Sequence, residues 1–126
     1  MAIPSGSGTE VLRRGVVATQ STTATSFKFD GTNPSTGTSS YTVPANHIIT
    51  MISIIVCEAA GQAETFDFQI NDGTSNIALL EDQALAGKAT FVWNDKFSLI
   101  GGDKFIVTCS SADVDFYYTY LDQDWS

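Results

Sequence analysis

The sequence predicts an all-β fold, a single two-sheet β-sandwich preceded by an extended amino-terminal arm. Aromatic and β-branched residues recur with a period of two, turn-forming residues punctuate the chain about every 8 to 12 residues, and no segment shows helical spacing. A chain of 126 residues is the size of one domain. We therefore expect an arm over residues 1–9 and a sandwich over residues 10–126, with a strand order that is jelly-roll-like or immunoglobulin-like.

The first third of the chain predicts one hairpin and one long loop. Residues 10–20 are β-branched and roughly alternating, and a polar turn over residues 21–25 separates them from the alternating Phe27 and Phe29. These features predict a hairpin. Residues 30–40 are dense in turn formers and predict a long surface loop.

A central strand follows this loop. The turn at residues 44–46 precedes a run over residues 48–57 that is apolar at both alternating sets of positions, as in the middle of a sheet. Residues 64–72 alternate cleanly, with Phe66 and Phe68 on the face predicted to be buried. The run over 48–57 is about half the length of a membrane-spanning helix.

The second half predicts further short strands joined by tight turns. Asp72-Gly73 predicts a hairpin that returns the chain into residues 77–80. Short strands are expected at 91–93 and 97–100, and the turn at 101–103 precedes a strand that buries its alternate residues Phe105, Val107 and Cys109.

The last strand, in the segment VDFYYTYL at residues 114–121, carries aromatic residues at both alternating sets of positions. One face should meet the core, and the other should meet something outside the domain. This second face is the predicted interface.

The charge of the chain argues against two classes of partner. Fourteen acidic and six basic residues give a net charge of −8 at pH 7. The averaged field repels phosphate backbones and anionic lipid headgroups, so we expect neither a nucleic-acid nor a membrane partner. The simplest role of this acidity is to keep the protein soluble.

The cysteines predict neither a metal site nor a cofactor. Cys57 and Cys109 lie in apolar runs, with no CxxC motif or paired histidine, so we expect free thiols. A cross-strand disulfide stays open if their strands are neighbours. The amino terminus has no export signal, which indicates synthesis in a reducing host cytoplasm.

The residues needed for catalysis are scarce. The single histidine, His47, directly follows a turn, and no nucleophile elbow or phosphate-binding loop accompanies it. The sequence therefore predicts a protein that is not an enzyme.

One series of segments, from about Tyr41 to Leu121, resembles a β-sandwich module of tailed-bacteriophage virion proteins. The series is VPANHIITMISIIVCE, ETFDFQINDG, IALLEDQALAGKATFVWND and FSLIGGDKFIVTCSSADVDFYYTYL, and the motif IPSGSGTEVLRR near the amino terminus stands beside it. The positions that match the pattern are residues 43–46, Gly87 and Gly102-Asp103. Because no fibrous stalk is appended, the chain is most similar to capsid decoration, or cement, proteins.

This resemblance implies a structural protein on the capsid surface of the virion, often a homotrimer, that binds the major capsid protein or another virion protein and stabilises the assembled shell. A neck or tail component is an alternative within the same family. A second alternative is a receptor- or glycan-binding module that uses the 31–40 loop or exposed Trp93 and Trp125.

The predicted partner contacts come from the arm, from a basic pair and from the last strand. They are Ile3, Arg13, Arg14, Phe116, Tyr118 and Tyr120. An arm can order as a strap across a neighbouring subunit, and the arginines can dock on an acidic neighbour. Alternatively, the arginines protect an edge strand from aggregation.

Overall fold

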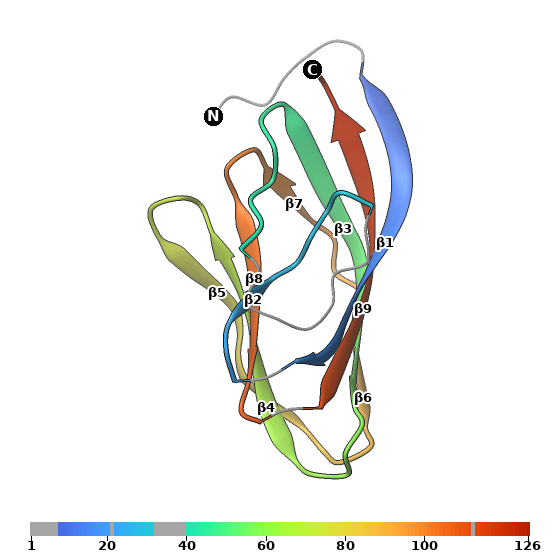
Figure 1. Ribbon diagram of the computed structural model, residues 1–126, viewed down its shortest axis with the longest axis vertical. Helices are drawn as coiled ribbons and strands as arrows, with labels where there is room; N and C mark the ends of the chain where they lie inside the picture. The colour runs from blue at the N-terminus through green and yellow to red at the C-terminus, as the bar shows by residue number, and fades with distance from the viewer. Residues whose placement is uncertain (1–7, 21, 32–39, 112) are drawn as a thin grey trace.

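Nine strands and no helices make up the described part of the chain in this computed structural model, which describes residues 8–20, 22–31, 40–111 and 113–126. The strands form two antiparallel sheets that pack face to face, so the predicted all-β sandwich is confirmed (Figure 1). The predicted arm over residues 1–9 lies outside the described residues except for Gly8 and Thr9, and so does most of the 30–40 loop.

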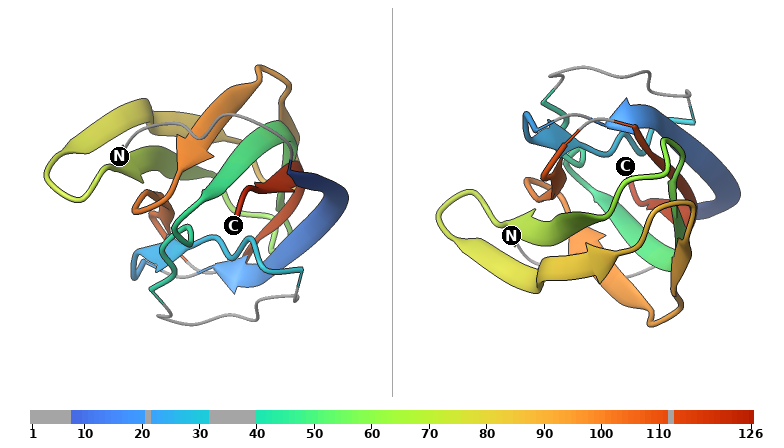
Figure 2. Two further views of the ribbon diagram at one scale, coloured as in Figure 1. Left: turned by 90° about the horizontal axis from the view of Figure 1, so that it is seen from above. Right: turned by 90° about the horizontal axis from the view of Figure 1, so that it is seen from below.

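Sheet A contains the longest strands. Its order is β1 (Thr9–Gln20), β9 (Val114–Asp124), β3 (His47–Glu58) and β6 (Thr90–Trp93), while β7 (Phe97–Ile100) pairs with the first part of β3. The order of sheet B is β2 (Thr25–Ser26), β8 (Lys104–Cys109), β4 (Glu64–Asn71) and β5 (Asn76–Leu85). Figure 2 shows the two sheets from the two ends of the sandwich.

The strand order is that of a jelly roll. The first strand lies beside the last, β1 against β9, and the second beside the penultimate, β2 against β8. An immunoglobulin-like order would not pair the strands in this way. The sequence pattern was compatible with both strand orders, and the observed pairings show the jelly-roll order.

The predicted hairpin between residues 10–20 and the Phe27–Phe29 segment is wrong. β1 pairs with β9, and the chain then crosses to the opposite sheet, where β2 pairs with β8. Phe27 and Phe29 are both buried between the sheets. Local alternation showed that each segment is extended, but the partner of β1 lies about a hundred residues away in the sequence, which a local pattern does not encode.

The other hairpin and strand predictions are confirmed. β4 pairs with β5 across the Asp72-Gly73 turn, and Phe66 and Phe68 are buried. On β8, Phe105, Val107 and Cys109 also point inward.

The core is dominated by aromatic rings contributed by both sheets. Phe27 stacks on Tyr118 with ring centroids 4.1 Å apart, and Phe68 lies 5.3 Å from Phe105. The hydroxyl of Tyr118 donates to the Lys28 carbonyl at 2.6 Å and accepts from the Lys28 N–H at 3.1 Å. Tyr118 therefore joins the centre of sheet A to the segment that follows β2.

Gly15 provides the space for this tyrosine. Gly15 pairs with Tyr118 across β1 and β9, and a Cβ atom at position 15 would lie 2.1 Å from Cζ of the Tyr118 ring. The ring covers the bare backbone of the glycine, an arrangement that protects glycines in sheets. The side chain of Tyr118 can therefore stay in the core only if position 15 has no side chain.

Glu58, the last residue of β3, joins two loops at the end of the sandwich opposite to the start of β1. Its carboxylate is buried and accepts hydrogen bonds from the backbone N–H groups of Ala60, Gly61, Gln62 and Lys88. Enclosure raises the pKa of this carboxyl, but the four backbone donors together lower it below its ordinary value of 4.5. The Lys88 ammonium adds a bond to the Ala59 carbonyl at 2.7 Å, so the β3–β4 and β5–β6 connections are held together.

Substituting Gly15 with alanine should destabilise the fold by roughly 3 kcal/mol, because the new methyl group overlaps a ring enclosed in the core. Thermal unfolding measures the loss. The exposed Ala18 on the same strand supplies a matched control, since Ala18→Val should change stability by less than about 0.5 kcal/mol. Equal melting temperatures for Gly15→Ala and wild type would show that Tyr118 does not lie against β1.

Substituting Glu58 with glutamine should lower the melting temperature at pH 7 by on the order of 5 °C, because one amide oxygen replaces two charged acceptors. The lowered pKa means that the carboxylate stabilises the fold above pH 4.5 and that this contribution disappears as pH falls through the folded-state pKa. The gap between wild type and variant should therefore shrink in acid. Glu81→Gln, at an exposed position, is the control, and a gap independent of pH would contradict the assignment.

Candidate interaction face

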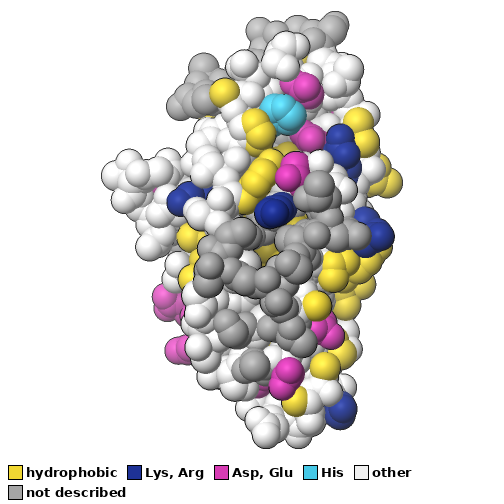
Figure 3. Space-filling view, viewed as in Figure 1, with side chains coloured by type: hydrophobic (Ala, Val, Ile, Leu, Met, Phe, Trp, Pro, Cys, Tyr) yellow, Lys and Arg dark blue, Asp and Glu magenta, His cyan; other side chains and the backbone are white. Residues whose placement is uncertain are grey.

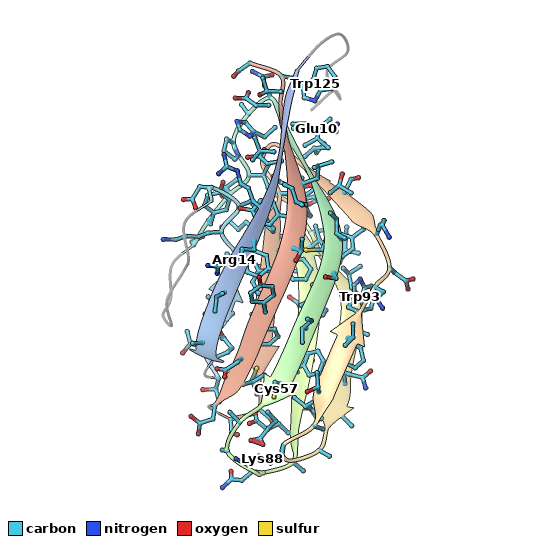
Figure 4. All side chains as sticks on the ribbon, turned by 90° about the vertical axis from the view of Figure 1, so that its right-hand side faces the viewer. Glu10, Arg14, Cys57, Lys88, Trp93 and Trp125 are labelled. Carbon is cyan, nitrogen blue, oxygen red and sulfur yellow. The ribbon has the colours of Figure 1, made fainter. Side chains whose placement is uncertain are left out.

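The outward side of sheet A carries a line of apolar side chains that spans four strands. The strand registers place Val16 beside Tyr117, Tyr117 beside Ile55, and Ile55 beside Val92. Tyr117, Ile55 and Val92 are 42%, 40% and 50% exposed. We call these four residues the outer row. Figure 4 views the side of the molecule on which this face lies.

More apolar groups lie toward the end of the sheet where β1 begins. Leu12, the most exposed large hydrophobic residue in the described chain at 65%, pairs with Leu121, and Ile48 pairs with Ile100. Figure 3 shows hydrophobic side chains along the right-hand edge, where β1 lies in Figure 1. Between these residues and the outer row lie the polar or charged side chains of Arg14, Thr119 and Ser53. We call the whole outward side of sheet A, with its apolar and polar residues, the outer face of sheet A.

Few charges interrupt this surface. On the described strands of sheet A, the charged side chains that point outward are Glu10, Arg14 and Asp115. Glu10 accepts a hydrogen bond from the amide of Gln123 at 2.7 Å. The guanidinium of Arg14 lies 5.8 Å from the ring centre of Tyr117, within the range of a cation–π contact.

The outward side of sheet B is different. On β4 the residues that alternate with the buried phenylalanines are Thr65, Asp67 and Gln69, and β8 presents Lys104, Ile106 and Thr108. This face is polar, as expected for a sheet that meets water on one side. The contrast between the two sheets identifies the outer face of sheet A as the candidate site.

The predicted partner contacts on the last strand are wrong, because their side chains point into the core and not outward. Phe116, Tyr118 and Tyr120 are all buried in the core, so they do not present a surface to a partner. The exposed aromatic residue of β9 is Tyr117. Both alternating sets contain aromatics, but Asp115 belongs to the set with Tyr117, and a charged residue marks the outward side. That signal was present in the sequence.

The basic pair divides between the two faces of β1. Arg14 points outward, as a partner contact requires, whereas Arg13 points inward, with its Nε 3.6 Å from Oδ2 of the buried Asp122. Arg13 therefore takes part in an internal ion pair. The remaining predicted contact, Ile3, lies outside the described residues.

His47 belongs to the same internal cluster. Its Nδ1 lies 2.8 Å from Asp122 Oδ1, and its Nε2 lies 3.5 Å from Asp124 Oδ1. In Figure 3 the histidine, in cyan, has acidic side chains beside it. Together with Arg13, these contacts link β1, β3 and β9 at one end of the sandwich, so the histidine has a structural use.

The environment of this cluster also affects a nearby tyrosine. Burial, followed by the neighbouring Asp30, Tyr120 and Asp122, raises the pKa of Tyr41 to about 12. The hydroxyl of Tyr41 therefore stays protonated at neutral pH and is available as a donor at this end of the sandwich.

The tryptophans do not form exposed aromatic platforms. Trp93 packs against Phe68 and Phe97, and its Nε1 donates to the Asp95 carbonyl at 2.8 Å. Trp125 is half-buried, with its ring close to Gly8. The alternative of a glycan site on these two rings loses its main support.

The two cysteines are free thiols, as predicted. Cys57 is half-buried on the outward side of β3, whereas Cys109 is buried on β8 in the other sheet. Burial, together with Glu64 and Asp67, raises the pKa of Cys109 to about 12, so its thiol is unreactive at neutral pH.

Two other kinds of site are absent from the described residues. Within these ranges, no cluster of three or more His, Cys, Asp or Glu side chains has an arrangement that could hold a metal ion. No helix in the described part of the chain is long and apolar enough to cross a membrane.

Comparison with known proteins supports the fold. No protein-family model matches this sequence, and no curated protein matches it. The chain is similar in structure to a chain from Bacillus endospore appendages, described as disulfide-linked pili, with a TM-score of 0.51 and 12% identity over 100% of this chain and 97% of that one.

A chain of infectious bursal disease virus, Gx strain, is also similar, with a TM-score of 0.42 and 12% identity. That match covers 90% of this chain but 37% of the viral chain, and at this TM-score it supports no inference. The likeness to the appendage chain extends over the whole domain. At 12% identity it shows that the two chains share a β-sandwich fold.

Proposed function

We propose that this protein is a structural, non-catalytic subunit of a virus particle, and that it decorates the capsid of a tailed bacteriophage. The observation that carries the structural role is the outer face of sheet A, which an exposed apolar row crosses on an otherwise acidic domain. The resemblance of residues 41–121 to virion modules supports the more specific assignment.

The shape and chemistry of this face favour a protein partner. Small ligands bind in concave pockets with a few converging polar groups, whereas a sheet face with a continuous apolar row suits another protein surface. Burial of a fully exposed Val or Ile side chain contributes roughly 1.5–3 kcal/mol, so Val92 and Ile55, which are 50% and 40% exposed, would each contribute about half of that. Several such side chains supply enough free energy for stable association.

The virion motifs serve as turns in the fold. Asn46 of the VPAN motif has a φ of 65°, and the His47 N–H donates to the Pro44 carbonyl at 3.2 Å. Gly102 has a φ of 94°, a conformation that favours glycine. The motifs therefore support a shared architecture, and contacts with other subunits of the assembly are left to the arm and the outer face of sheet A.

In the decoration role, the protein binds assembled coat subunits and so stabilises the shell by linkage. Weak contacts, repeated over a lattice and joined through one molecule, give strong overall attachment. The partner is the major capsid protein or another virion protein, and the location is the outer surface of the head. A neck or tail position remains an alternative within this proposal.

A second candidate function follows from the full-length similarity to the endospore appendage chain. In this alternative the protein is a repeating subunit of a surface filament. Electron microscopy of the concentrated purified protein distinguishes the two functions, because a filament subunit forms long polymers whereas a decoration protein stays discrete until it meets capsids.

Deletion of residues 2–7 should reduce incorporation into phage particles by about tenfold or more, because the arm is the proposed strap across neighbouring coat subunits. Quantitative mass spectrometry of purified particles measures the incorporated copies. Electron cryomicroscopy of the same wild-type particles shows where the copies lie.

The matched control replaces residues 2–7 with a Gly/Ser segment of equal length, which separates the role of the arm sequence from that of its length. Unchanged incorporation of the deletion variant would contradict the strap. Density confined to the neck or tail would move the protein there, and particles that lack the protein would contradict the virion assignment.

A further inference from the structure

We infer that a second copy of this chain covers the outer face of sheet A, in a face-to-face contact about a twofold axis that follows the outer row. This inference rests on the structural role proposed above, whichever assembly the protein belongs to. It replaces the trimer implied by the family resemblance with a dimer.

The outer row supplies the geometry. Its residues are register partners on adjacent strands, so the row runs across β1, β9, β3 and β6. A rotation of 180° about this line stacks the two sheets and places each member of the row over its own counterpart. Sheets commonly pack face to face with their strands aligned and with about 10 Å between the two sheets.

The charges on the face are complementary under the same rotation. Thr119 and Asp115 flank Tyr117 on the outward side of β9, and Arg14 is the register partner of Thr119. Arg14 therefore lies on one side of the outer row, with Glu10 further along that side, and Asp115 lies on the other side. The rotation reverses these sides, so Arg14 of each copy comes close to Asp115 of its partner, twice in the dimer.

The distribution of acidic residues favours this face for self-association. The β4–β5 hairpin and its surroundings carry Asp67, Asp72, Glu81 and Asp82, all half-exposed or exposed. Two copies that met there would bring like charges together. On the outer face of sheet A a contact between identical copies buries apolar side chains and pairs opposite charges.

The dimer also extends the proposed function. β1 begins at Thr9 at one end of sheet A (Figure 1), and a twofold axis across the strands places the two copies of Thr9 at opposite ends of the dimer. The two amino-terminal arms are therefore attached at opposite ends of the dimer. One dimer can thereby bind two separate coat subunits, which is what avidity on a lattice requires.

Sedimentation velocity of the full chain over a range of concentrations tests the inference. Wild type should be a dimer, and Val92→Lys should raise the dissociation constant by about 100-fold or more, because two lysines then meet across the axis. Ile77→Lys is the matched control, since Ile77 is 48% exposed but lies on β5 in sheet B, and this variant should dimerise as wild type does.

Charge reversal tests the pairing itself. Arg14→Asp and Asp115→Arg should each weaken the dimer by about tenfold, and the double variant should recover most of the loss. Unchanged circular dichroism spectra would show that the variants remain folded, since weakening a dimer by itself lowers the melting temperature. A dimer that responds to Val92→Lys but is not rescued by the double reversal would overturn the proposed twofold arrangement.

Other outcomes overturn the inference while sparing the proposed function. These are a wild-type monomer at concentrations on the order of 100 µM, a trimer, or a dimer that is insensitive to Val92→Lys. A monomeric wild type whose incorporation into particles is lost in Val92→Lys would assign the face to another virion protein. Conversely, a dimer with the predicted sensitivities that occurs in no particle would support the inference and contradict the virion role.

Discussion

The alternation of side chains along β9 is the constraint on which the rest of this structure depends. β9 lies between β1 and β3, so its facing determines the facing of the whole centre of sheet A. Its inward set includes Tyr118, whose ring fills the space left by Gly15 and whose hydroxyl binds the backbone of Lys28. A shift of one residue in this register would expose three large aromatic residues and bury Asp115.

The same alternation creates the candidate interface. Because one set of β9 residues fills the core, the other set faces outward with Tyr117 at its centre, and the neighbouring strands complete the apolar outer row. The buried Asp122 has internal partners, since it binds His47 and lies close to Arg13. The domain therefore uses its ionisable clusters for folding, and the largely uncharged sheet face is the surface left for association.

The sequence predicted what depends on local pattern and missed what depends on long-range pairing. Strands such as β4 and β8 were predictable because one set of alternating residues is apolar and the other is polar. The partner of β1 was not, because extended conformation does not specify a neighbour. Apolar residues alone did not predict which side of β9 faces the core, because both alternating sets contain aromatics. The charged Asp115 indicated the outward set. The role of Glu58 depends on backbone N–H groups that converge only once two distant loops meet, so its identity as an acidic residue gave no signal.

The central claim is that the outer face of sheet A is covered in the native assembly. Hydroxyl-radical footprinting of that assembly tests the claim most directly. Tyr117 on this face and Ile77 on the β4–β5 hairpin are similarly exposed in the isolated chain. For each residue, the oxidation rate in the assembly is compared with the rate of the same residue in dissociated protein. The rate of Tyr117 should fall severalfold on assembly, while the rate of Ile77 should stay unchanged. Equal reactivity of Tyr117 in the assembled and dissociated states would contradict the account.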